Sequence, residues 1–227
     1  MAIGGNLDRV PGSILSVCYS SNERSISRLM AEFLAQKDAD ESKKTLFYVD
    51  AMDRFPVAEF CELLPPQEHA ALFENVRVLT SLDMDELSST VGQISRSIFA
   101  ARSTHHRSAT SDHTTAVEPA PQALIVVRGF DVIFRNTALK DQQHAHRSLK
   151  DTMLRLRMLG NLDDFGARTI LIFPPLQAPP LTHETKPGLQ PPLQKRHKSG
   201  APSFQNNNSV SAYVMKFYAD SVIDVDT

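Results

Sequence analysis

The sequence has few cysteines and no long apolar run. Its two cysteines, Cys18 and Cys61, lie in apolar segments, where a free cysteine behaves as a small core residue, so neither a disulfide nor a metal pair is expected. No stretch approaches the roughly 18 apolar residues of a membrane span, and the N-terminus does not resemble a signal peptide. The sequence therefore predicts an intracellular protein without a membrane partner.

Net charge is also small, but it is unevenly distributed along the chain. The formal charge is −2, and 41% of the residues are hydrophobic, which is enough for a sizeable core. Residues 1–120 hold 11 Lys and Arg against 17 Asp and Glu, whereas residues 121–227 hold 13 against 9. This asymmetry permits a polyanion-binding face in the C-terminal half.

Short apolar segments alternate with helical patterns. Strands are expected near residues 13–19, 45–50, 75–80, 123–128, 167–173 and 219–225, and helices near 21–34, 56–64, 83–98, 147–159 and 211–218. This alternation predicts an α/β fold with a mostly parallel twisted sheet flanked by helices on both faces. Residues 1–12 read as a flexible lead-in, and 13–227 as one core domain with flexible insertions at about 101–122 and 176–209.

The most apolar strand lacks the acid that nucleotide chemistry needs. Residues 123–130 read ALIVVRGF and are typical of a strand buried on both faces of a parallel sheet. In nucleotide-hydrolysing α/β proteins this strand ends in an acidic residue that holds Mg²⁺. Here it ends in Arg128 and Gly129.

The phosphate-binding loop is missing as well. The junction after the first strand, residues 19–25, has neither the glycines that bring the backbone close to phosphates nor a lysine. Glu23 would repel phosphates, and Arg24 is a poor substitute for the lysine. Asp50 and Asp131 remain possible metal ligands, but capping a turn is the favoured role for both. We therefore expect no enzyme activity, no catalytic residues, no metal and no cofactor.

The long C-terminal insertion is the better functional candidate. It carries a group of cations that can follow a phosphate backbone, and two more lie after the central strand, on the side where parallel sheets bind ligands. A solvated linker with incidental charge is the alternative interpretation. The candidate DNA-binding residues are Lys186, Lys195, Arg196, His197, Lys198, Arg135 and Lys140.

Three apolar residues are candidates for binding a partner protein. Leu154 and Met158 form a second stripe on the long helix, nearly opposite its core face, and this stripe either packs under a loop or contacts another protein. Phe55 lies in a turn between Arg54 and Pro56. It is either a hydrophobic staple against the following helix or an exposed aromatic anchor.

Several segments, in order and at matching intervals, resemble a known family. Residues 123–173 look like the second half of the RecA-type recombinase core, from the metal-site strand to the strand before the second DNA loop. More specifically, residues 45–100 and 123–225 resemble the chromosome segregation in meiosis subunits of the yeast Shu complex, which are recombinase paralogues. The matching segments include FYVDA at 47–51, LDMDELS at 82–88, VIFRN at 132–136, LRLRMLGN at 154–161 and FYADS at 217–221.

The resemblance implies a single RecA-like core with degenerate nucleotide-binding motifs, in a nuclear and non-catalytic subunit. Such a subunit forms a heterodimer with a second RecA-like Shu-complex subunit and works with further Shu subunits, the recombinase and its paralogues. The pair is expected to bind DNA with single-stranded or forked character, and to promote recombinase filament assembly in homologous recombination and error-free DNA damage repair. The family's two DNA loops correspond to residues 134–146 and 176–209. A pure protein-interaction scaffold and an ATP-binding motor are the alternative functions.

Overall fold

The computed structural model describes residues 13–36, 43–52, 54–111, 120–175, 209–223 and 225. Six strands in these residues form one sheet in the order β3-β2-β4-β5-β1-β6, and every pairing is parallel. The predicted α/β class with a RecA-like parallel sheet is confirmed. The strands are β1 (Leu15–Tyr19), β2 (Lys44–Asp50), β3 (Val76–Thr80), β4 (Gln122–Arg128), β5 (Gly166–Phe173) and β6 (Ser221–Ile223).

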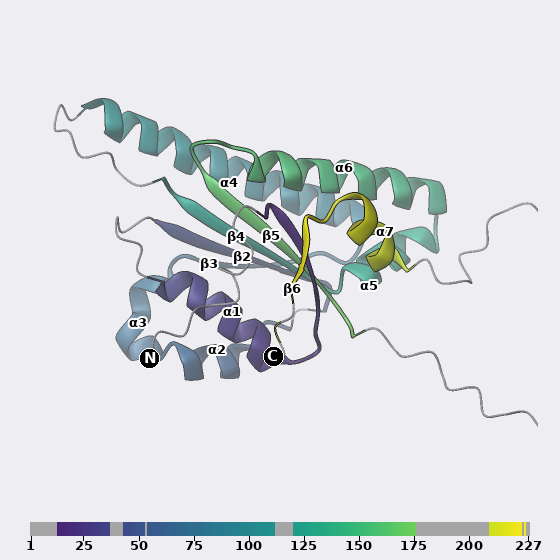
Figure 1. Cartoon of the computed structure of the whole chain (residues 1–227), viewed down its shortest axis with the longest axis horizontal. Coiled ribbons are helices and arrows are strands. Elements are labelled where there is room, and N and C mark those ends of the chain that lie inside the picture. Colours follow the sequence, from purple (N-terminus) through teal and green to yellow (C-terminus); the bar gives the residue numbers. More distant parts are fainter. Residues whose placement is uncertain are drawn as a thin grey trace, which may run out of the picture.

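Helices cover both faces of the sheet (Figure 1). One face carries α1 (Glu23–Ala35), α2 (Val57–Leu63) and α3 (Pro66–Phe73). The other carries α4 (Met84–Ser111), α5 (Phe130–Ala138), α6 (Gln142–Gly160) and α7 (Val210–Phe217). Buried side chains accordingly form two apolar clusters, one on each side of the sheet. No helix among the described residues is long and apolar enough to cross a bilayer.

Strand β4 lies inside the sheet between β2 and β5, as its composition predicts. Leu124 and Val126 point into the cluster under α1, whereas Ile125 and Val127 point into the cluster under α4 and α6. All four are fully buried. A strand buried on both faces needs an uninterrupted apolar run rather than an alternating one, which explains this segment.

Helix α4 begins where predicted but ends later. The carboxylate of Asp83 accepts the amides of Asp85 and Glu86, both at 3.1 Å, and caps the helix. The helix then continues to Ser111, so the predicted insertion is helical over residues 101–111. Arg102 and His106 both pair with Asp164, in the connection before β5, which anchors this extension to the body of the domain.

Helix α6 also differs from the prediction, because it starts at Gln142 rather than near residue 147. The side chain of Asp141 accepts the amide of His144 at 3.0 Å and caps the helix. Since α5 runs to Ala138, residues 134–146 are two helices joined by a tight turn. The expected first DNA loop is therefore not a loop.

The remaining differences are small. Helix α3 begins at Pro66 and was not predicted, because a proline pair that ends one helix can also occupy the first turn of the next. Both cysteines are free, as predicted, and Cys18 is buried in the core. The lead-in at 1–12 and most of the second insertion, residues 176–208, lie outside the described residues.

Candidate functional site

In the turn between β1 and α1, side chains of the turn itself accept hydrogen bonds from its backbone amides. Asn22 caps α1, and its side-chain oxygen accepts the amides of Arg24 at 3.1 Å and Ser25 at 3.4 Å. The hydroxyl of Ser20 accepts the amide of Asn22 at 3.0 Å. Three of the amides that could face a phosphate at this helix N-terminus, those of Asn22, Arg24 and Ser25, are thus already used within the turn.

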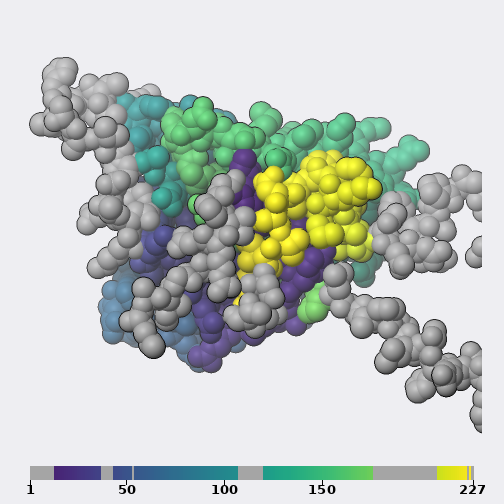
Figure 2. All heavy atoms as spheres, in the orientation of Figure 1, coloured from purple at the N-terminus to yellow at the C-terminus, as the bar shows by residue number. Residues whose placement is uncertain are grey.

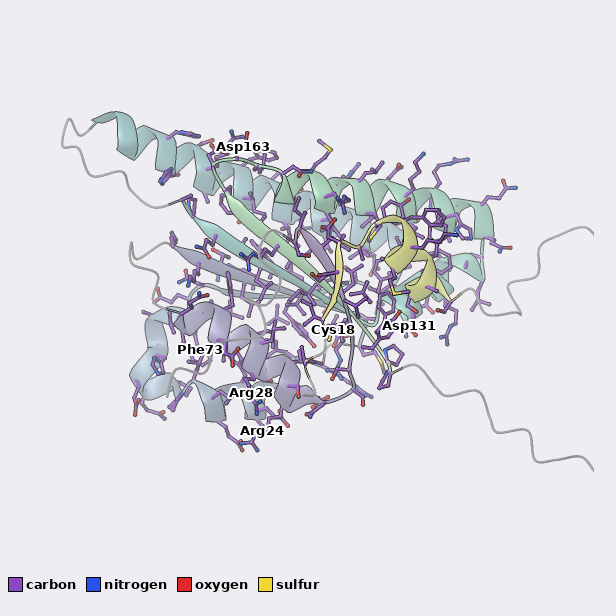
Figure 3. All side chains as sticks on the ribbon, in the orientation of Figure 1. Cys18, Arg24, Arg28, Phe73, Asp131 and Asp163 are labelled. Carbon is purple, nitrogen blue, oxygen red and sulfur yellow. The ribbon has the colours of Figure 1, made fainter. Side chains whose placement is uncertain are left out.

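Arg24 does not replace the missing lysine. Its guanidinium lies 4.0 Å from the carboxylate of Glu62 on α2, and both side chains are largely exposed. In Figure 3 the Arg24 side chain extends from the outer side of α1, away from the sheet. The guanidinium is thus directed toward α2 rather than toward the sheet edge.

Arg128 fills the position of the metal-binding acid. Its guanidinium lies 3.2 Å from the carboxylate of Glu23 in the first turn of α1, and it donates to the carbonyl of Arg54 at 3.3 Å. Its side chain is 19% exposed. Burial lowers the pKa of Arg128, but hydrogen bonds with Tyr48 and Glu23 raise it above its ordinary value. A permanent positive charge, neutralised by Glu23, therefore occupies this edge of the sheet.

Tyr48 completes this network from β2. Its hydroxyl donates to the carbonyl of Arg54 at 3.2 Å. Burial raises the pKa of Tyr48 to about 12, so the hydroxyl remains protonated and can keep donating. The network joins β2, β4, α1 and the turn before α2 through side chains and carbonyls of the chain itself.

Gly129 follows Arg128 for a conformational reason. It adopts a left-handed conformation with φ of 70°, and a Cβ at this position would lie 2.9 Å from the Cβ of Ala51. Only glycine tolerates both constraints. The turn from β4 into α5 therefore requires glycine here.

The two candidate metal acids have structural partners. Asp50 is buried, and its carboxylate accepts the amides of Met52 at 3.3 Å and Arg54 at 2.6 Å, which holds the turn after β2. Asp131 pairs with Arg135 at 3.4 Å. The described residues contain no cluster of His, Cys, Asp or Glu suited to a metal ion.

The two described DNA-binding candidates are exposed but paired with acids. Arg135 lies on α5 beside Asp131, and Lys140 lies in the α5–α6 turn, 3.6 Å from the carboxylate of Asp83. The hydrogen bond from the amide of Glu86 lowers the pKa of Asp83, so this acid remains ionised. A phosphate at either cation would have to compete with its carboxylate.

The other DNA-binding candidates, Lys186, Lys195, Arg196, His197 and Lys198, lie outside the described residues. The chain leaves β5 through Pro174 and Pro175 and returns at Ser209, which caps α7. Both ends are at the carboxyl edge of the sheet, next to α5 (Figure 1).

Phe55 lies in an aromatic cluster. Its ring centroid is 5.1 Å from that of Tyr48 and 5.2 Å from that of Phe60, with edge-to-face geometry in both pairs. It is half-buried against the core under α1. This packing favours the staple alternative, so a role for Phe55 in binding a partner stays a proposal.

Replacing Phe55 with Ala is expected to lower the melting temperature by about 4–8 °C. The lost contacts of a half-buried ring are worth about 2 kcal/mol, and a domain of this size loses about 2–4 °C per kcal/mol. Thermal denaturation followed by circular dichroism measures the change. Phe55→Leu is the control and should lose less. An unchanged melting temperature in Phe55→Ala would instead favour the exposed-anchor alternative.

Leu154 and Met158 are exposed on α6, as the second apolar stripe predicts. Their side chains are 45% and 69% exposed, and no described element covers them. Sequence reasoning missed a second exposed apolar group, Met215 and Phe217 on α7 and Val222 on β6. The signal was present, because a two-turn helix reading VSAYVMKF has too many large apolar residues to bury on one face.

Arg157 joins these two regions. It lies on α6 between the exposed residues, donates to the carbonyl of Tyr218 and lies 2.8 Å from the carboxylate of Asp220. Asp220 in turn accepts the amides of Ile14 and Leu15. Figure 2 shows α7 and β6, in yellow, as a raised area directly beside the green α6.

A cavity of about 510 Å³ lies among α5, α6, α7 and the end of β5. Its floor includes the buried Leu149 and Phe173, and its rim includes Leu139 and Arg135. Pro175 and Ser209, the two ends of the long insertion, also line it. In Figure 3 Asp131, another lining residue, lies beside α7, whereas Asp163 lies at the opposite end of the sheet.

Comparisons with known proteins identify relatives of this chain. The family model of the Shu complex component Csm2, described as DNA-binding, matches residues 15–219. Chromosome segregation in meiosis protein 2 of Saccharomyces cerevisiae is 32% identical over 208 residues, covering 86% of this chain and 91% of that protein. The protein of the same name in Candida glabrata is 27% identical over 214 residues, covering 92% and 95%.

The family match spans the five strands β1 to β5, and it includes Arg128 and the β1–α1 turn. The chain therefore belongs to the Csm2 family of DNA-binding Shu complex components.

Proposed function

We propose that this protein is a non-catalytic DNA-binding subunit of a heterodimer of RecA-like recombinase paralogues. In this role it promotes recombinase filament assembly in homologous recombination and error-free DNA damage repair, in the nucleus. One observation carries the proposal. The Arg128–Glu23 pair fills the place where a RecA-like ATPase would hold its metal and nucleotide, in a chain whose family is described as DNA-binding.

DNA binding is assigned to Arg135 and Lys140, after the central strand, and to the cations of the long insertion. Arg135 and Lys140 are each paired with a carboxylate, so they contribute less than their exposure suggests. The main contribution is assigned to the sequence cluster at 195–198, which has no acidic residue among its neighbours from 185 to 208. DNA with single-stranded or forked character is the proposed ligand.

The exposed apolar residues of α6 are assigned to a protein partner. Leu154 and Met158 are flanked by the exposed cations Lys150 and Arg155, an arrangement of apolar centre and charged rim that is common in interfaces. The proposed partner is a second RecA-like Shu-complex subunit. Further Shu subunits, the recombinase and its paralogues complete the set of proposed partners.

Gel-shift binding of a forked oligonucleotide tests the DNA assignment. The chain should shift the fork both alone and, more tightly, with its co-expressed partner subunit. If only the partner binds DNA, and its affinity is the same with and without this chain, the protein is a pure interaction scaffold instead.

Replacing Leu154 and Met158 with Lys is expected to weaken the heterodimer by about 10-fold or more, because two lysines would have to be buried in an apolar interface. Titration of the labelled chain with the partner subunit measures the dissociation constant. Val57→Lys is the matched control, since Val57 is comparably exposed but lies on α2, on the opposite face of the sheet. Unchanged affinity in the double variant would remove these residues from the interface.

A further inference from the structure

The cavity among α5, α6 and α7 has an aromatic wall. The ring of His146 on α6 lies 5.2 Å from the ring of Phe134 on α5 and 6.1 Å from the ring of Tyr213 on α7, measured between centroids. All three residues line the cavity. Helices α5, α6 and α7 therefore each supply one ring to the same concave surface. The apolar Leu149 and Phe173 form its floor.

The charges in this wall cancel. Asp131 and Arg135 both line the cavity and lie 3.4 Å apart. A phosphate would meet a carboxylate as closely as a guanidinium, so the cavity does not suit an anion. The amide of Gln142 and the hydroxyl of Ser209 add neutral donors and acceptors to the lining. The favoured ligand is neutral, with apolar faces and a polar edge.

We propose that this cavity binds an unpaired nucleobase of the DNA, with the base against the aromatic wall and its polar edge toward the Asp131–Arg135 pair and Gln142. This inference rests on the proposed DNA-binding function. Ligand pockets in proteins are commonly about 300–1,000 Å³, and a cavity of about 510 Å³ has room for a base and part of its sugar. Leu139, at the rim, is 80% exposed.

A nucleobase fits this cavity better than an apolar side chain of a partner protein. An aliphatic anchor would pack well against the apolar floor. It would also remove the Asp131–Arg135 pair, the Gln142 amide and the Ser209 hydroxyl from water without replacing their hydrogen bonds. A base can stack its apolar faces on the aromatic wall and form hydrogen bonds with the polar lining groups through its edge. A base in a duplex must first be unpaired and unstacked, at a cost in free energy, so the site favours single-stranded or frayed DNA.

The experiment uses the full chain co-purified with its partner subunit and a thymine oligonucleotide that contains one 2-aminopurine. Binding should change the 2-aminopurine fluorescence, because stacking on an aromatic side chain quenches it. Tyr213→Leu should remove most of this change and weaken single-strand affinity about 5-fold to 150-fold, the range expected for one lost stacking contact. Duplex affinity and the salt dependence of binding should stay the same, since stacking releases no counterions.

Two further variants distinguish loss of the cavity from loss of folding. Ala138→Phe fills the cavity and leaves the three rings in place, and it should have the same effect on single-strand binding as Tyr213→Leu. Phe99→Leu is the control, because Phe99 is an exposed aromatic residue on α4 that does not line the cavity. Thermal denaturation verifies that each variant is folded.

Unchanged fluorescence and single-strand affinity in folded Tyr213→Leu and Ala138→Phe would overturn the proposal. Weaker binding of the partner subunit with unchanged DNA binding would also overturn it, in favour of a protein anchor in the cavity. If the wild-type complex bound no DNA at all, the proposed function itself would fail, and the base site with it.

Discussion

Replacing Lys195, Arg196 and Lys198 together with Ala is expected to lower DNA affinity by about 10-fold to 100-fold at physiological salt. Each cation that neutralises a phosphate releases about 0.7 counterions from single-stranded DNA. Removing three of them should reduce the slope of log affinity against log salt by about 2. Fluorescence anisotropy of a labelled oligonucleotide at several salt concentrations measures both quantities.

A charge-preserving variant separates charge from chain conformation. Lys195→Arg with Lys198→Arg keeps every positive charge and should keep the wild-type slope, since backbone contacts depend on charge rather than on a specific side chain. Unchanged affinity of the triple Ala variant, measured in the heterodimer, would contradict the assignment of DNA binding to this cluster. Binding would then have to rest on the partner subunit or on other cations.

Replacing Arg128 with Met is expected to reduce the free energy of unfolding by about 2 kcal/mol. The substitution keeps an apolar stem but leaves the carboxylate of Glu23 without its donor and the carbonyl of Arg54 with the Tyr48 hydroxyl alone, and hydrogen bonds to charged groups contribute about 1.5–3 kcal/mol each. The cost is moderate because Glu23 is 41% exposed and can be rehydrated. Urea denaturation measures the change.

A double-mutant cycle isolates the ion pair itself. Glu23→Gln combined with Arg128→Met should destabilise less than the sum of the two single changes, with a coupling of about 1 kcal/mol. Arg96→Met, at an exposed position on α4, is the control and should change stability by less than about 0.5 kcal/mol. If the changes in the free energy of unfolding were fully additive, the Arg128–Glu23 ion pair would not contribute to stability.

The β-sheet was predictable because each strand has a local signal. A run such as ALIVV at 123–127 can be satisfied only by burial on two faces, and this places β4 inside the sheet without any knowledge of its neighbours. The start of α4 was predictable for the same reason, because Asp83 and the apolar positions that follow it are close together in the sequence.

The site was only half predictable. The sequence reveals that Arg128 stands where an acid is needed, but the partner of Arg128 is Glu23, 105 residues earlier, and no local pattern links them. The extension of α4 likewise depends on Asp164, which is 62 residues from Arg102. The α5–α6 turn was mistaken for a loop because the cap at Asp141 lies in a polar stretch without an apolar period.

Phe55 illustrates a different limit. A phenylalanine between an arginine and a proline has the same sequence signature whether it is a staple or an exposed anchor. The distinction depends on Tyr48 and Phe60, whose rings meet it edge to face. Tertiary packing decides such cases, and periodicity does not.

Calorimetric titration of Mg–ATP into the purified chain tests the central claim most directly. With Asn22 capping the amides of α1 and Arg128 paired to Glu23 in the place of the metal-binding acid, no saturable heat is predicted at millimolar nucleotide. The same preparation should bind a forked oligonucleotide without nucleotide. Saturable binding of Mg–ATP that is lost in Arg24→Ala would contradict the account and identify the chain as a nucleotide-binding motor subunit.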